Sequence, residues 1–208
     1  MDVYEAISKR MTIRDFAPKE IPQQVVERIL CAGLQAPSND HLRRWEFILV
    51  QDRQVREKLV SKIRPPQTQK GTAALVKRMQ LSDDNQQEMY RQAIPKQQAM
   101  LLDAALLVIP CFHISGELLK PETLSSLNSF ASIWCCIENI LIAAASEGIF
   151  GVTRIPFEPE RTHLHKVLHI PPEYEMPCYL ALGYPAENAR RAAQNPINVK
   201  EKLHVNIW

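Results

Sequence analysis

Three histidines close together in the sequence are the first candidates for chemistry. His163, His165 and His169 lie within seven residues of one another, and imidazole nitrogens are common zinc ligands. The segment from residue 159 to about residue 168 has a helical pattern, which places His163 and His165 about 200° apart around the helix axis. Side chains on nearly opposite faces of a helix do not share an ion, so we expect no metal site here.

Cysteine chemistry is equally unsupported. The five cysteines sit among apolar neighbours, form no C-x-x-C pair and are odd in number; they are Cys31, Cys111, Cys135, Cys136 and Cys178. This usage is typical of buried thiols in a reduced, cytoplasmic protein. The adjacent pair at 135–136 lies in an apolar helical stretch, which favours a place in the core over a redox role. No Ser-His-Asp nucleophile motif and no glycine-rich phosphate loop is present.

Composition limits the remaining classes of function. The chain has 208 residues, of which 46% are hydrophobic and 23% charged. These are ordinary globular values, and they allow a sizeable core in a single domain spanning residues 1–208. The net charge of +2 gives no electrostatic footprint for nucleic acid or an anionic membrane. The longest apolar run, residues 104–114, is too short to span a bilayer, and no secretory signal begins the chain.

Hydrophobic periodicity predicts helices and strands in alternation. We expect helices over residues 3–11, 22–34, 55–63, 124–147 and 159–168, with a short one near 73–81. Buried strands are predicted at 46–50, 105–113, 152–155 and 178–184. This order lacks a regular strand-helix-strand rhythm and indicates an α+β domain. Residues 64–98 are polar and suit a lid. Residues 203–208 alternate as a strand does, which suggests an arm, residues 198–208, lying on a partner subunit.

Several separated segments resemble the FMN-dependent nitroreductase family. Residues 10–16, RMTIRDF, are similar to the family's opening R-x-S/T-x-R/K-x-F, and residues 36–47, APSNDHLRRWEF, to its A-P-S-x-x-N-x-Q-P-W-x-F loop. Residues 143–157 resemble a third segment. Residues 168–171, LHIP, and 181–187, ALGYPAE, are similar to L-x-I-P and L-G-Y-P-x-E. Their order and spacing cover nearly the whole chain except residues 64–98.

The resemblance implies a central, mostly antiparallel sheet flanked by helices, in an intertwined homodimer with an FMN in each of two clefts between the subunits. NAD(P)H would reduce the flavin and leave, and an electron-poor small-molecule acceptor would then receive the hydride. The flavin would carry the chemistry, so no catalytic side chain is expected. The resemblance assigns cofactor contacts to Arg10, Met11, Thr12, Arg14, Pro37, Ser38, Asn39, His41, Thr153, Arg154, Ile155 and Pro156.

The implied roles follow from the residue types. Arg10 and Thr12 would hold the FMN phosphate, because guanidinium forks suit a dianion. Arg14 would stabilise negative charge at the flavin N1/O2 edge. The backbone N–H of Ile155 would tune N5. Each role has a plain alternative: a solvated helix-end arginine for Arg10, a surface ion pair with Asp15 for Arg14, an ordinary turn for residues 38–40 and a simple strand end for residues 153–156.

The sequence departs from the family pattern at three places. His41 stands where the family usually has Asn, and Pro156 where many members have Gly. The basic pair K-x-R that usually holds the FMN phosphate falls near Gln194 and Pro196, which carry no charge. We expect Arg190 and Arg191, just upstream, to replace that pair.

Two alternatives stay open beside the NAD(P)H oxidoreductase. One is a flavin-binding store or redox sensor without turnover. The other is an enzyme of the same fold that transforms the flavin or removes halogen from an aromatic ring.

Overall fold

The computed structural model describes residues 1–208 and divides them into two compact units. The larger unit comprises Met1–Pro66 and Lys96–Arg191, and the smaller one Gln67–Pro95 and Ala192–Trp208. The smaller unit thus combines most of the polar segment 64–98 with the C-terminal arm. The larger unit contains every strand and every segment that resembles the family motifs.

A five-stranded sheet forms the centre of the larger unit. The order along the sheet is β1-β2-β5-β3, with β4 also paired to β2, and every pair of neighbours is antiparallel. The predicted antiparallel sheet is therefore confirmed. The strands are β1 (Trp45–Leu49), β2 (Leu106–His113), β3 (Phe150–Arg154), β4 (Tyr174–Glu175) and β5 (Tyr179–Gly183). Only the two-residue β4 was missed, because so short a strand has no detectable alternation.

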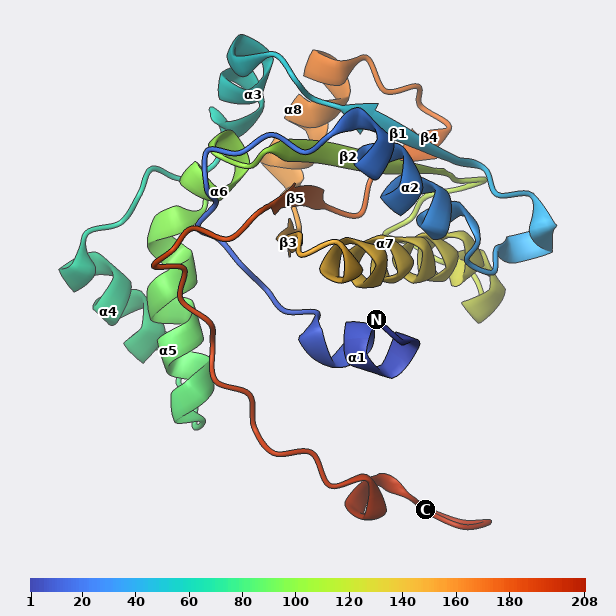
Figure 1. Ribbon diagram of the computed structural model, residues 1–208. Coiled ribbons are helices and arrows are strands. Elements are labelled where there is room, and N and C mark those ends of the chain that lie inside the picture. The colour runs from blue at the N-terminus through green and yellow to red at the C-terminus, as the bar shows by residue number, and fades with distance from the viewer. The chain divides into compact units, whose positions relative to one another are not determined.

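Helices cover both faces of this sheet, and β2 contributes side chains to a separate hydrophobic core on each face (Figure 1). Leu106 and Val108 point toward α2 (Gln23–Leu34) and α7 (Asn128–Ser146). Leu107 and Ile109 point toward α3 (Arg53–Val60), α6 (Ala99–Leu102) and α8 (Glu158–Leu168). Alternate residues of a strand face opposite sides, so a strand covered on both sides reads as a continuous apolar run.

The helix α7 is packed closely against α2. A Cβ atom placed on Gly33 of α2 would lie 2.5 Å from Cγ1 of Ile140 of α7, so only glycine permits this approach. The stretch Leu124–Ser146 is also long and apolar enough to cross a membrane by length and composition, although only 33% of its apolar window is buried. Its contacts with α2 and the sheet account for the buried face of this helix. The short 3-10 helix Leu124–Leu127 precedes α7.

At the N-terminus, α1 (Val3–Lys9) lies along α7. The side chain of Asp2 accepts a hydrogen bond of 2.9 Å from the backbone N–H of Glu5, as the N-cap prediction requires. The helix ends at Lys9, before the predicted Met11, and the chain continues as an extended segment.

The smaller unit contains α4 (Gln69–Arg78), α5 (Asp84–Ala93) and the 3-10 turn Val199–Lys202. Asn195 ties the two parts of this unit together, because its side chain hydrogen-bonds to Asn85 at 2.6 Å and to Asp83 at 2.9 Å. The predicted helix near 73–81 corresponds to α4, while α5 was not predicted because its sequence is almost wholly polar. Residues 203–208 form no strand within the single chain, where His204 stacks on Trp208, and the arm on a partner subunit stays a prediction.

Candidate functional site

The first family-like segment follows the free edge of β3. Thr12 pairs with Gly151 in a parallel bridge, and the N–H of Ile13 donates to the Gly151 carbonyl at 3.1 Å. Further along, the N–H of Ala17 donates to the Tyr184 carbonyl at 2.8 Å. Backbone hydrogen bonds at both ends therefore hold residues 12–17 against the sheet and bring two family-like segments, 10–16 and 143–157, side by side.

Within this extended segment the side chains alternate. Ile13 is buried in the protein, with 1% of its surface exposed, whereas Arg10, Thr12 and Arg14 are partly exposed. Residues two apart in an extended chain lie on the same side. Two guanidinium groups and a hydroxyl are consequently presented from one side of the segment, which is a donor set suited to an anion. Met11, also predicted as a contact, lies between them in the chain.

The charges around this donor set are partly balanced by neighbouring carboxylates. Arg10 Nε lies 3.1 Å from Oε1 of Glu138 on α7, in a pair that is substantially exposed. Asp15 accepts hydrogen bonds of 2.6 and 2.5 Å from Nζ of Lys96. Burial lowers the pKa of Arg14 from its ordinary value, and the carboxylate of Asp15 partly opposes this effect. Arg14 is thus held in a partly desolvated position, where its interaction with a negatively charged partner is stronger than in water.

A buried ion pair lies at the end of β3, within the predicted cofactor segment 153–156. Arg154 donates to Glu160 through Nη1 at 2.5 Å and Nη2 at 2.9 Å, and its Nε donates to Gln97 at 2.8 Å. Its side chain is only 7% exposed, so we assign it to the scaffold, and a cofactor contact from residue 154 could come only from its backbone. Thr153 is partly buried. Ile155 and Phe157, by contrast, are 65% and 74% exposed.

The loop from Pro37 to Arg44 is held by polar contacts in a strained backbone. Ser38 Oγ accepts from the N–H of Arg43 at 3.1 Å, and the N–H of Asn39 donates to Ser132 Oγ at 3.0 Å. Three residues other than glycine have positive φ angles, namely Asp40 (53°), His41 (56°) and Arg43 (44°). Such conformations each cost of the order of 1–3 kcal/mol and concentrate at functional sites.

These two halves of the predicted site lie far apart within one chain. The loop leads directly into β1, whereas residues 10–16 lie alongside β3. These two strands are at opposite ends of the order β1-β2-β5-β3. Since residues 12–13 pair with the outer edge of β3, four strand spacings, about 19 Å, separate them from β1. The structure therefore brings residues 10–14 together with residues 153–156, and separates both from Pro37, Ser38, Asn39 and His41.

Arg190 and Arg191 follow the last strand in an extended tail. Both are exposed, and neither side chain makes an ion pair or hydrogen bond within the chain. The N–H of Ala189 donates to the Ala186 carbonyl at 2.9 Å, and the N–H of Ala186 to the Asp15 carbonyl at 3.0 Å. The start of this tail is thus fixed next to the segment that carries Arg14.

The histidines and cysteines set aside above serve the scaffold. His163 Nε2 lies 2.7 Å from the Lys58 carbonyl, while His165 Nε2 lies 3.1 Å from the buried carboxylate of Glu175. The two side chains thus have separate partners. No group of three or more histidine, cysteine or acidic residues is arranged to hold a metal ion. All five cysteines are free thiols, and Cys111, Cys136 and Cys178 are buried as predicted. The prediction is wrong for Cys31 and Cys135, which are exposed because they lie on the outward faces of α2 and α7.

Sequence reasoning missed two carboxylates that matter here. Glu160 closes the segment after β3, and Glu138 faces Arg10. Glu160 lies three residues after the N-cap residue Phe157, and its carboxylate accepts a hydrogen bond of 3.3 Å from the Phe157 N–H. A glutamate at this spacing at the start of a helix is a signal that the sequence does show. Glu138 carried no signal, because an acidic residue within an apolar helix does not indicate its partner.

The chain has an antiparallel sheet with helices on both faces, and a donor set suited to an anion lies at the edge of that sheet. Comparison with known proteins assigns a chain with these features to one family. The model of the nitroreductase family matches residues 7–184. The chain belongs to the nitroreductase family.

Curated relatives and solved structures agree with this assignment. A protein of Methanothermobacter thermautotrophicus named "Putative NADH dehydrogenase/NAD(P)H nitroreductase" is 29% identical, over 100% of this chain and 88% of the relative. An iodotyrosine deiodinase of Haliscomenobacter hydrossis is 27% identical, over 90% and 81%. The NADPH:FMN oxidoreductase of Vibrio harveyi, solved with NAD+, shares the fold with a TM-score of 0.70 and 19% identity, over 99% and 77%.

Proposed function

We propose that this protein is an FMN-dependent NAD(P)H oxidoreductase that reduces an electron-poor acceptor, such as a nitroaromatic or a quinone, in a ping-pong reaction. The pairing of Thr12 with Gly151 is the observation that carries the proposal, because it joins the donor set of residues 10–14 to the segment after β3. Relatives named as an NAD(P)H nitroreductase and an NADH dehydrogenase support the choice of reductant.

The donor set fits FMN. When bound, FMN supplies the redox chemistry by taking up a hydride from NAD(P)H and passing it to the acceptor. Arg10 and Thr12 hold the phosphate, with Arg190 or Arg191 as a further cation. Arg14 places positive charge where negative charge develops on reduction. The N–H of Ile155 acts as the donor near N5, because Pro156 has no N–H.

Two subunits complete each site in this proposal. Residues 37–41 lie at the opposite edge of the sheet from residues 10–14, so the loop of one chain would serve the donor set of its partner. Large apolar side chains are exposed on α1, where Tyr4 is 81% exposed, and on the arm, where Trp208 is 99% exposed. Exposure of this kind favours burial against a second copy. The homodimer, the arm on the partner and a cytoplasmic location all belong to this proposal.

The polar segment 64–98 is proposed to set the choice of acceptor. It is the stretch least similar to the family, and it supplies α4 and α5 of the smaller unit. Shortening it should change the relative rates with different acceptors and leave bound FMN in place.

One spectroscopic experiment tests the proposed reaction. The purified protein should be yellow, should bleach within seconds of adding NADH or NADPH under nitrogen, and should regain its colour on adding a nitroaromatic or quinone. Yellow protein that does not bleach would make it a flavin store instead. Protein that takes up no FMN would remove both functions.

A second candidate is reductive removal of halogen from an aromatic ring. An iodotyrosine deiodinase is 27% identical to this chain, and another, solved with FMN and 3-iodo-L-tyrosine, shares the fold with a TM-score of 0.73 and 18% identity over 100% of both chains. Release of iodide from 3-iodo-L-tyrosine by the reduced protein, faster than reduction of a nitroaromatic, would favour this candidate.

A further inference from the structure

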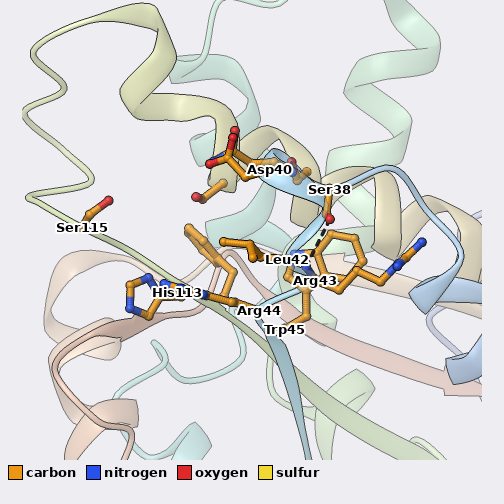
Figure 2. A pocket seen from close by; sticks show the side chains of 12 residues that line it. Ser38, Asp40, Leu42, Arg43, Arg44, Trp45, His113 and Ser115 are labelled. Atoms are coloured by element: carbon orange, nitrogen blue, oxygen red, sulfur yellow. Dashed lines mark hydrogen bonds between the residues drawn. The ribbon is translucent and has the colours of Figure 1, made fainter.

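A small polar pocket lies between the strained loop, the end of β2 and the start of α7 (Figure 2). Its volume is about 140 Å³, which is room for several waters or one small anionic group. In Figure 2, Arg44 and His113 lie together on the strand side of the pocket, joined by a backbone hydrogen bond of 3.1 Å, while Asp40 lies across from them.

Two arginines give this pocket its charge. Arg43 and Arg44 line it, and they occupy the positions where the family loop has Gln and Pro. Neither side chain makes an ion pair or hydrogen bond within the chain. The single carboxylate in the lining belongs to Asp40, which accepts a hydrogen bond of 2.9 Å from Asn39. Both arginines are exposed, and two cations against one carboxylate give the pocket a net positive charge that can attract an anion.

Hydroxyl groups add neutral donors to the lining. Ser115 and Ser129 line the pocket, and neither hydroxyl is used in a hydrogen bond elsewhere in the chain. Ser38 is used differently, because its Oγ holds the backbone N–H of Arg43 at 3.1 Å. That bond fixes Arg43 at a φ of 44°, a conformation that non-glycine residues adopt only when the surroundings impose it.

From this arrangement we infer that the pocket binds an anionic group, phosphate or carboxylate, carried by the reductant or by the acceptor. The inference rests on the proposed function, since Ser38 and Asn39 line this pocket and are also proposed to contact the flavin. A substrate bound at the flavin would thus have its charged end within reach of Arg43 and Arg44. Guanidinium groups suit phosphate and carboxylate because their planar donors match both anions.

The test compares wild type with the Arg43→Gln/Arg44→Gln variant, and uses Lys62→Gln, an exposed cation outside both the pocket and segment 64–98, as the control. Two pairs of substrates differ only in an anionic group: NADPH against NADH, and 4-nitrobenzoate against 4-nitrobenzyl alcohol. A charge-assisted contact corresponds to about a 10- to 150-fold change in kcat/KM. We expect that loss only for the member of one pair that carries the additional anionic group, with its counterpart and the control within about twofold.

The pair that responds identifies the source of the anion. Loss with NADPH alone assigns the pocket to the 2′-phosphate, and loss with 4-nitrobenzoate alone assigns it to an acidic acceptor. A double variant whose kcat/KM equals that of wild type with all four substrates would overturn the inference. Weaker FMN binding in the double variant would also overturn it, because the arginines would then serve the cofactor.

A second measurement keeps this result separate from the proposed function. Calorimetric titration of the FMN-loaded protein with inorganic pyrophosphate should show binding that the double variant loses and the control keeps. Absence of binding to wild type contradicts the pocket, whatever the protein's activity. Failure of NAD(P)H to bleach the flavin contradicts only the proposed reaction.

Discussion

Arg154 and Glu160 form a buried, bidentate ion pair. In the sequence its two partners flank Ile155 and Phe157, which are exposed, and Pro156, which is half-buried. Glu160 Oε2 also accepts from the N–H of Phe157 at 3.3 Å. The pair therefore fixes both ends of the segment that we assign to the flavin N5 region, and a short loop with both ends fixed keeps its backbone donor in place.

Arg154→Ala should destabilise the protein strongly. Removing one partner of a buried ion pair leaves an uncompensated charge and costs about 3–5 kcal/mol. Urea unfolding at a fixed FMN concentration measures this loss. Glu57→Gln, which breaks the exposed pair with Arg53, is the control and should cost about 0–1 kcal/mol. If Arg154→Ala loses no more than the control, the pair does not hold this segment.

Buried thiols should make the fold sensitive to high pH. Burial raises the pKa of Cys111 and Cys136 from 9.0 to about 12, and raises that of Cys178 further. The folded protein keeps these protons while the unfolded chain loses them above about pH 9, so their contribution is complete below pH 9 and declines above it. Each proton corresponds to about 1.4 kcal/mol per pH unit, so the three thiols contribute about 4 kcal/mol per pH unit near pH 10–11. Burial also raises the pKa of Tyr179, which adds to the slope above pH 10. Unfolding at each pH checks the slope, which Cys136→Ala should reduce by about 1.4 kcal/mol per pH unit. An unchanged slope in that variant would show that the thiol ionises in the folded protein.

Substitutions of the two partners of the Arg10–Glu138 ion pair should change the affinity for FMN in opposite directions. Arg10→Ala should weaken FMN about 10- to 150-fold, because it removes a charge-assisted contact. Glu138→Gln should tighten FMN by up to about fivefold, because Glu138 competes for the same guanidinium in an exposed pair. FMN fluorescence titration gives both dissociation constants.

The tail cations are tested in the same titration. Arg190→Ala/Arg191→Ala should weaken FMN by a similar factor if these residues replace the family's basic pair. Loss in Arg10→Ala alone would mean that the tail arginines face solvent. No loss in either variant would remove Arg10 from the phosphate site.

The sequence was most informative where burial dictates residue type. The apolar run of β2 and the helical stripe of α2 predicted their elements to within a few residues, because both lie in the core. Polar α5 lacks such a stripe, and the tail at 203–208 has a strand-like pattern without a strand to pair with. Motifs made Arg10 and Thr12 candidates for the cofactor site, which stays a prediction. Only the folded chain shows that Arg154 turns inward and that residues 37–41 lie at the other edge of the sheet.

Deleting residues 198–208 should weaken the dimer. The arm exposes Val205, Ile207 and Trp208, which gain stability only when another surface covers them. Sedimentation equilibrium of the full-length and shortened chains measures the dimer dissociation constant, and absorbance reports bound FMN. Equal dimer affinity and flavin content in both chains would show that the arm does not bind the partner.

The central claim is that each flavin site takes its donor set from one chain and its loop from the other. Arg10→Ala/Arg14→Ala removes the donor set, and Ser38→Ala/Asn39→Ala/His41→Ala removes the loop contacts. Each variant alone should lose FMN while remaining a dimer. The two chains are then co-expressed with different tags and the heterodimer is purified. Because a two-fold dimer has two equivalent sites, the heterodimer should contain one doubly damaged site and one intact site, and should bind about one FMN per dimer. A heterodimer that binds no FMN would contradict the account, since every site would then be built within a single chain.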